Sequence, residues 1–218
     1  GDNRIQVYSD WIEQQFATPA TSMMSLVDAS IPLFGDEHKP NVRTDSFWPI
    51  ALYGQDQLRQ RMAFALSEIL VVSDRNSVAN NAYRGLPNYW DMLAENAFGT
   101  YRQTLEDVTL HPIMGVYLSH LRNQKADPET GAYPDENFAR EVMQLFTFGL
   151  VHRQKNGGVI LGSDNLPLPT YDNNVIKQMA KVFTGLSFSQ LEAAGASVSN
   201  NKFKRGLAVN DYQFRWIA

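Results

Sequence analysis

Residues 134–150 read Pro-Asp-Glu-Asn-Phe-Ala-Arg-Glu-Val-Met-Gln-Leu-Phe-Thr-Phe-Gly-Leu. Asp135 suits the N-cap of a helix, because its carboxylate can accept the free N–H groups of the first turn. Gly149 suits the position after the last turn, where a left-handed backbone costs glycine little. Apolar residues recur at helical spacing and predict one buried stripe, made of Phe138, Val142, Leu145 and Phe146. The stretch therefore predicts a helix with one face against a core.

A row of polar side chains runs beside this stripe. Asn137, Glu141 and Gln144 are spaced i, i+4 and i+7, so they share one flank of the helix. A carboxylate at the margin of a core needs a partner. We expect Glu141 to be ionised and paired with Arg61 or Arg59, which stand beside the apolar stripe of another helix. This pairing would be structural; a substrate or metal role for Glu141 is the alternative.

Glu136 and Arg140 stand on the more exposed side of the same helix. Their i, i+4 spacing, acid before base, predicts a surface ion pair. A pair of carboxylates for acid–base chemistry would need Glu141 to meet Glu68 or Glu106 across two helices. The sequence pattern of each helix does not show whether the two helices cross with these side chains facing each other.

The composition is that of an ordinary globular protein. The 218 residues include 44% hydrophobic and 19% charged residues, and no apolar run is long enough to predict a transmembrane segment. The net charge is −4, and the compact basic cluster Lys202, Lys204 and Arg205 is too small to predict a nucleic-acid surface. The absence of cysteine excludes disulfides, thiolate metal sites and a cysteine nucleophile.

Helix signals dominate the rest of the chain. Capping residues and apolar spacing predict further helices near 9–18, 23–27, 45–53, 55–72, 87–98, 101–110, 112–121 and 172–185. The stripe of the 134–150 stretch is expected to be buried. Further residues expected in the core are Leu58, Met62, Leu66, Ile69, Val182 and Phe183. An Asn156-Gly157-Gly158 turn predicts a hairpin over 150–161. The predicted fold is mainly α, an irregular multi-helix domain with one small β-hairpin.

The domain organisation follows from the same signals. Residues 1–218 are expected to form a single helical domain, in which 186–218 is loop-rich and rich in Ser, Asn, Ala and Gly. The chain stops after Phe214-Arg215-Trp216-Ile217-Ala218 without a terminating signal, which suggests a fragment of a longer protein. Its start at Gly1-Asp2-Asn3 shows no signal peptide, although one could have been removed.

Several ordered sequence blocks resemble one known family. The blocks are Leu58-Arg59-Gln60-Arg61-Met62-Ala63-Phe64-Ala65-Leu66-Ser67-Glu68-Ile69, Asn96-Ala97-Phe98-Gly99, Thr109-Leu110-His111-Pro112-Ile113-Met114-Gly115, Lys125-Ala126-Asp127, the 135–149 helix, Thr170-Tyr171-Asp172 and Val182-Phe183-Thr184-Gly185. Over roughly residues 11–186 they resemble the bacterial domain of unknown function 1800. The sequence departs mildly from that family at Asp135, where Asn is usual, and at Leu186, where Trp is usual.

The resemblance implies an exported or envelope-associated bacterial protein, located in the periplasm, at the cell surface or outside the cell. Members are longer than this chain, so a missing C-terminal part of the same protein is one implied partner. A phosphatase/sulfatase-like protein encoded nearby is the other. The resemblance implies no agreed reaction and no catalytic residues.

The sequence contains no motif that names a reaction. It lacks a Gly-x-Ser-x-Gly elbow, a phosphate-binding glycine loop, a dinucleotide fingerprint and a His-Glu-x-x-His motif. The four histidines, His38, His111, His120 and His152, do not have the spacing of a zinc site. His111, directly before Pro112, is expected to cap a helix start, with a catalytic role as the alternative.

No cofactor is predicted. Asp127, Glu129, Asp135 and Glu136 nevertheless cluster around the loop from Asn123 to Pro134, where oxygen ligands could converge on a hard cation such as calcium. Solvated loops often have this composition, and the spacing is not that of an EF-hand.

Two functional hypotheses follow from these features. The first is a non-catalytic helical scaffold or partner-binding module, favoured by the lack of a catalytic motif and by 11% aromatic residues. The alternative is an exported hydrolase that uses carboxylates near Glu141. The candidate site residues are Glu141, Asn137, Gln144, Arg61, Glu68 and His111.

Overall fold

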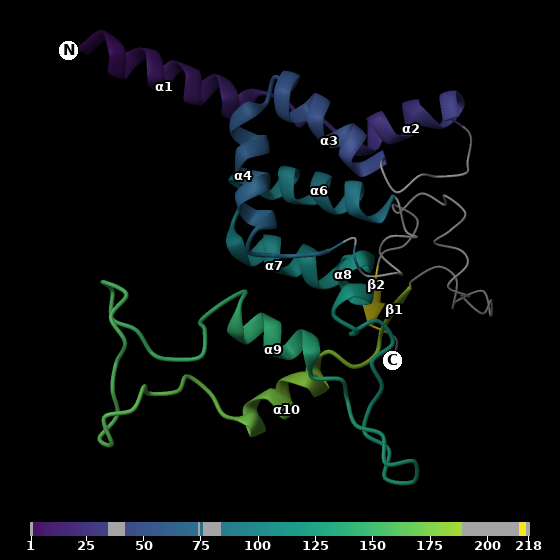
Figure 1. Cartoon of the computed structure of the whole chain (residues 1–218), viewed down its shortest axis with the longest axis vertical. Coiled ribbons are helices and arrows are strands. Elements are labelled where there is room, and N and C mark those ends of the chain that lie inside the picture. Colours follow the sequence, from purple (N-terminus) through teal and green to yellow (C-terminus); the bar gives the residue numbers. More distant parts are fainter. Residues whose placement is uncertain (1, 35–41, 74, 76–83, 189–213, 217–218) are drawn as a thin grey trace. The chain divides into compact units, whose positions relative to one another are not determined.

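The computed structural model describes residues 2–34, 42–73, 75, 84–188 and 214–216, and these are mainly helical (Figure 1). The α-helices are α1 (Asp2–Ala17), α2 (Met23–Phe34), α3 (Val42–Tyr53), α4 (Gln57–Ser67), α6 (Gly85–Glu95), α7 (Tyr101–Leu110), α8 (Pro112–Tyr117), α9 (Asn137–Gln144) and α10 (Asn173–Val182). A 3₁₀ turn, η1 (Asn96–Phe98), follows α6. The strands β1 (Leu186–Phe188) and β2 (Phe214–Trp216) form an antiparallel pair. No described helix is both long and apolar enough to cross a membrane.

The described residues fall into two compact units. The first unit contains residues 2–117, and the second contains residues 118–188 and 214–216. The expected mainly helical class is confirmed, as is the predicted hairpin turn, which bridges Arg153 and Val159. The organisation of residues 1–218 as one domain stays a prediction.

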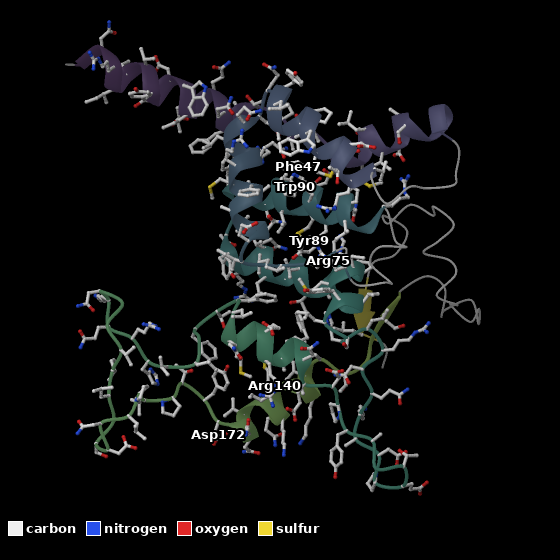
Figure 2. All side chains as sticks on the ribbon, in the orientation of Figure 1. Phe47, Arg75, Tyr89, Trp90, Arg140 and Asp172 are labelled. Atoms are coloured by element: carbon white, nitrogen blue, oxygen red, sulfur yellow. The ribbon has the colours of Figure 1, made fainter. Side chains whose placement is uncertain are left out.

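In the first unit, α6 is the central helix. It packs against α2, α4 and α8, and α4 in turn contacts α1. The apolar core around it is fully buried at Val27, Leu93, Val108 and Ile113. Phe47 and Trp90 meet edge to face between α3 and α6, with ring centroids 5.1 Å apart (Figure 2).

A buried polar network fixes the junction between α1 and α2. The Asp56 carboxylate is completely buried and accepts hydrogen bonds from the backbone and the hydroxyl of Thr21, at 2.8 and 2.5 Å. Gln60 donates to the same carboxylate at 3.0 Å and accepts the Trp90 indole N–H at 2.8 Å. Burial raises the pKa of Asp56, but these hydrogen bonds outweigh it and leave the pKa below the ordinary value.

Asp91 caps α2 although it belongs to α6. Its carboxylate accepts the backbone N–H groups of Met23 and Met24, at 2.6 and 3.0 Å, and the Ser22 hydroxyl at 2.7 Å. The free N–H groups of a helix start are therefore satisfied from another helix.

The buried face of α4 differs from the predicted one. The buried residues along this segment are Asp56, Gln60, Ala63 and Leu70, whereas Met62 and Ile69 are 39% and 47% exposed. Leu58 and Leu66 are only half-buried. The polar network turns this side of the helix inward, so the apolar stripe at Leu58, Met62, Leu66 and Ile69 was the wrong choice of core face.

In the second unit, α9 packs against α10. The α9 face inside this contact includes Phe138, which is 1% exposed and lies between two rings. His120 stacks on it at 3.8 Å, and Phe183 meets it edge to face at 4.8 Å. Phe138, Val142, Phe146 and Phe183 are buried as predicted. Leu145 and Val182 are 59% and 54% exposed, so the prediction for those two was wrong; α9 ends at Gln144, before Leu145.

Residues 150–170 form an arm that the sequence pattern predicted only in part. Three extended segments are joined in a closed ring: His152 N–H donates to Leu168 O, Ile160 N–H to His152 O, and Leu168 N–H to Ile160 O, each at 2.9 Å. We call residues 150–170 the ring arm; Figure 1 shows it in light green beside α9 and α10.

The two turns of the ring arm repeat each other. In the first, Gln154 N–H donates to Gly158 O, and in the second Gly162 N–H donates to Leu166 O, both at 2.8 Å. Each turn is closed by an Asx side chain, Asn156 or Asp164, which accepts the backbone N–H two residues later at 3.0 Å. Gly157 and Asn165 occupy the same left-handed position, with φ of 85° and 61°.

Candidate functional site

A clamped loop carries one wall of the candidate site. The Asn123 side chain accepts the Asp135 N–H at 2.7 Å and donates to the Asp135 carbonyl at 3.1 Å, which closes the loop between them. The backbone of Asn123 in turn accepts the Gly185 N–H at 2.9 Å. Hydrogen bonds therefore fix both ends of the loop. Tyr133, which lies between them, is exposed.

The start of α9 is the second part of the site. Asp135 accepts the Asn137 N–H at 2.8 Å and so satisfies one free N–H of the helix start, but the N-cap position itself is held by Glu136, one residue later than predicted. The Glu136–Arg140 ion pair is also confirmed, at 2.6 Å. Arg140 lies between α9 and α10 in Figure 2. Glu136 is therefore neutralised by a neighbour on its own helix.

The outer face of α10 is the third part. Asp172 caps this helix by accepting the Val175 N–H at 2.9 Å, and Ile176 and Ala180 are buried beneath it. Lys177 and Lys181 follow each other at i and i+4 on the exposed side. Such a like-charged pair weakens an isolated helix slightly unless an anion lies nearby.

These three parts enclose a pocket of about 490 Å³. We call it the α10 pocket. Its apolar wall is made by Ala126, Tyr133, Pro134 and Ala180. Its polar wall is made by Glu136, Asn174, Lys177, Gln178 and Lys181. The volume lies in the range of about 300–1,000 Å³ that is usual for ligand pockets.

Two lysines give the α10 pocket its charge. Lys181 donates to Gln178 at 3.0 Å, and Lys177 has no hydrogen bond or ion pair among the described residues. The one carboxylate of the lining, Glu136, is already paired with Arg140. The pocket therefore offers two ammonium groups beside an apolar wall.

Residues 3–212 match the family described as a protein of unknown function, DUF1800. The chain belongs to this family. The resemblance drawn from the sequence blocks is thereby confirmed. No curated protein and no solved structure matches this DUF1800 chain.

Glu141 lies on α9 of this DUF1800 chain, half-buried. Its Oε2 atom is buried and has no hydrogen-bond partner among the described residues. Burial raises the pKa of Glu141 above its ordinary value. Asn137 is exposed and Gln144 half-buried, and neither donates to the carboxylate. A site around Glu141 bordered by Asn137 and Gln144 stays a prediction.

The arginines proposed as partners of Glu141 belong to the first unit and have partners there. Arg61 donates to the Ala51 carbonyl and to Gln57, both at 3.2 Å. Arg59 donates to the Ala94 carbonyl at 3.1 Å and lies over the Phe98 ring. A pair with Glu141 would join the two units and stays a prediction, as does a carboxylate pair with Glu68 or Glu106.

His111 has the structural role that was expected. It is buried at the start of α8, where its Nδ1 accepts the Ile113 N–H at 3.3 Å. Its Nε2 is 2.9 Å from Asn88 Oδ1, which assigns the proton of the neutral ring to Nε2. Burial lowers the pKa of His111 to about 3. The residue is therefore a neutral helix cap.

The acidic loop uses its oxygens internally. Asp127 accepts the Glu129 N–H at 2.9 Å and the Thr130 hydroxyl at 2.8 Å, and these two bonds lower its pKa. Across the described residues, no three His, Asp or Glu side chains converge as a metal ion would require. His38 and the cluster Lys202, Lys204 and Arg205 lie outside the described residues.

Sequence reasoning missed the α10 pocket. The 172–185 helix was predicted, but its lysines were not considered together with the Asn123–Pro134 loop. The available signal was the i, i+4 spacing of Lys177 and Lys181. The second half of the signal, the approach of Tyr133 to that helix, depends on a tertiary contact.

Proposed function

We propose that the chain is a partner-binding module whose binding site is the α10 pocket. The observation that carries this proposal is the character of the lining: an apolar wall with Tyr133, two lysines, and one carboxylate that Arg140 neutralises. General acid–base catalysis needs a titratable group free to exchange a proton. The lining holds no histidine, serine or unpaired carboxylate for that purpose, so binding without reaction fits it best.

The test is a nuclear magnetic resonance screen of the ¹⁵N-labelled chain with a library of small aromatic and carboxylic fragments. Binding fragments should shift the signals of Tyr133, Lys177 and Lys181 and should be recovered unchanged. The variant Asn174→Trp, which adds a large side chain at an exposed position of the pocket lining, should abolish the shifts. The variant Val159→Trp on the ring arm adds the same side chain elsewhere and should leave them intact. Fragments that bind only elsewhere, or that are recovered cleaved, would overturn the proposal.

The alternative of a hydrolase has one specific observation in its favour. Glu141 combines a buried, unpartnered carboxylate oxygen with a raised pKa, which is the condition of a general acid. If this alternative holds, Glu141→Gln should abolish turnover of a polymer substrate and leave the fold intact. A panel of chromogenic glycosides, peptides and phosphate or sulfate esters would provide the substrates. Activity that persists in the variant would contradict it.

The location and the natural partner extend the proposal. We propose, from the resemblance stated for the sequence blocks, that the protein is exported or envelope-associated and works with a phosphatase/sulfatase-like neighbour or with further sequence of the same protein. Cell fractionation with an antibody against the chain tests the location. Recovery in the cytoplasm alone would contradict it.

A further inference from the structure

The exposed face of α10 has three parallel strips. Helical spacing places Asn174 and Gln178 in the middle, between two differently built edges. Lys177 and Lys181 form one edge. Val175 and Val182, which are 44% and 54% exposed, form the other. A surface with a basic edge and an apolar edge fits a chain that presents acidic and apolar side chains alternately.

The pocket beside this face is open to the surface along one wall. Tyr133 is 84% exposed although it forms one wall. A compound of pocket size would leave the outer side of that ring, and both valines, in water. A longer ligand that runs along α10 would cover all three.

Charge decides the nature of that ligand. The chain as a whole carries a net charge of −4, so a basic strip is a local departure from the average. Glu136, the one carboxylate of the lining, is neutralised by Arg140 and leaves the two lysines uncompensated. Complementary potential steers and orients binding partners. The occupant should therefore carry negative charge at intervals that match one helical turn.

From these observations we infer that the α10 pocket binds an acidic peptide segment of a partner protein, with an apolar side chain seated against Tyr133 and carboxylates at Lys177 and Lys181. This inference rests on the proposed function and names the partner's chemistry. An extended peptide repeats same-side residues every 6–7 Å or so, close to the spacing of i, i+4 side chains on a helix. Alternating leucine and glutamate would therefore space successive carboxylates to match Lys177 and Lys181.

The experiment uses the full chain and a fluorescein-labelled decapeptide of alternating leucine and glutamate. Fluorescence anisotropy should show saturable binding that weakens as salt is raised. Peptides with serine or lysine in place of glutamate should bind at least tenfold more weakly. Free glutamate and inorganic phosphate, tested as competitors, should not displace the decapeptide at millimolar concentration.

Charge-reversal variants locate the binding. Lys177→Glu and Lys181→Glu should each weaken binding of the decapeptide about tenfold, as expected for one lost charge-assisted contact. Lys155→Glu on the ring arm makes the same charge change away from the pocket and should leave the affinity unchanged. Circular dichroism and melting temperature establish that each variant is folded.

The outcomes separate this inference from the proposed function. Equal binding of the glutamate and serine peptides, or equal loss in Lys155→Glu and Lys177→Glu, would overturn the acidic-peptide inference. If neutral fragments still occupied the α10 pocket, the proposed function would stand. Displacement of the decapeptide by phosphate would reassign the lysines to a small anion and also overturn the inference.

Discussion

At the scale of single residues, Glu141 is costly to the fold as a charged group. Its buried Oε2 has no hydrogen-bond partner among the described residues, and burial raises its pKa. A carboxyl whose pKa is raised on folding favours its neutral form in the native state. The stability of the native state relative to the unfolded state therefore decreases as pH rises from the unfolded pKa through the raised native value.

Glu141→Gln should accordingly leave the melting temperature at pH 7 unchanged or raise it. The amide keeps the shape and removes the buried charge. At pH 4, where the carboxyl is largely neutral, the difference from the parent should vanish. Thermal melts at both pH values make the comparison. A melting temperature that falls at pH 7 would instead support an ion pair with Arg59 or Arg61.

The burial of His111 predicts that the fold loses stability in acid. Its native pKa of about 3 lies below the ordinary value of 6.5, because burial disfavours the charged ring. Between these values the unfolded chain binds a proton that the native chain does not, so the free energy of unfolding falls as pH decreases. The fall reaches up to about 1.4 kcal/mol per pH unit, and the stability is complete only above the unfolded pKa.

The variant His111→Asn isolates this contribution. Asparagine still offers a side-chain oxygen to the Ile113 N–H but does not titrate. Urea unfolding from pH 7 to pH 4 should show the parent losing stability faster than the variant. Parallel curves for the two proteins would show that His111 does not carry the effect.

At the scale of elements, the Asn123 clamp controls the wall of the α10 pocket. Asn123→Ala removes both hydrogen bonds to the backbone of the exposed Asp135 and should cost about 0.5–1.5 kcal/mol of unfolding free energy for each bond. Asn123→Asp keeps the acceptor for the Asp135 N–H but loses the donor, and should fall between parent and alanine variant.

The readout that links the clamp to the site is hydrogen exchange. Amides around Tyr133 should exchange faster in Asn123→Ala, while those of α6 should not. Uniform acceleration over the whole chain would indicate global destabilisation, and no acceleration would show that the loop is held by other contacts.

The elements also show where sequence reasoning succeeds. The caps at Asp172 and His111 were predictable, because each acts on a backbone group within three residues. The buried face of α4 was not, because Gln60 and Asp56 enter the core through partners as distant as Thr21 and Trp90. Apolar spacing predicts a helix, but it does not show that polar residues with distant hydrogen-bond partners will form the buried face of that helix.

The site divides in the same way. Glu136, Asn137 and Glu141 were singled out because they share one helix with a strong pattern. Lys177 and Tyr133 come together only through the closure of a loop on α10. The local sequence predicts the helices that carry the pocket residues. Only the tertiary contacts bring those residues together into a pocket.

At the scale of the whole molecule, mainly helical structure was predictable because helix signals are local. The β1–β2 pair was not predictable, since it joins Leu186–Phe188 to Phe214–Trp216 across a long stretch of chain. Residues 186–218 had been expected only to be loop-rich. Pairing between distant segments leaves no signature in either segment alone.

Exposed apolar residues predict association of the chain with itself at high concentration. Ile5, Tyr8 and Ile12 recur at helical spacing along α1 and are 70%, 67% and 38% exposed. Sedimentation velocity should show a concentration-dependent increase in mass. Ile5→Asp with Tyr8→Asp should suppress it, whereas Asn3→Asp with Gln14→Asp adds equal charge outside the stripe and should not. A parent that stays monomeric at every concentration would contradict the prediction.

The ring arm has a consequence for engineering. Because its backbone hydrogen bonds close on themselves at His152, Ile160 and Leu168, the three segments depend on one another more than on the helices. Its two tips, near Asn156 and Asp164, are exposed turns that lie outside the ring. An epitope tag or a fluorescent reporter grafted at either tip would lengthen a loop at little entropic cost. The arm is therefore a natural insertion point for labelling this protein without touching α9, α10 or the pocket.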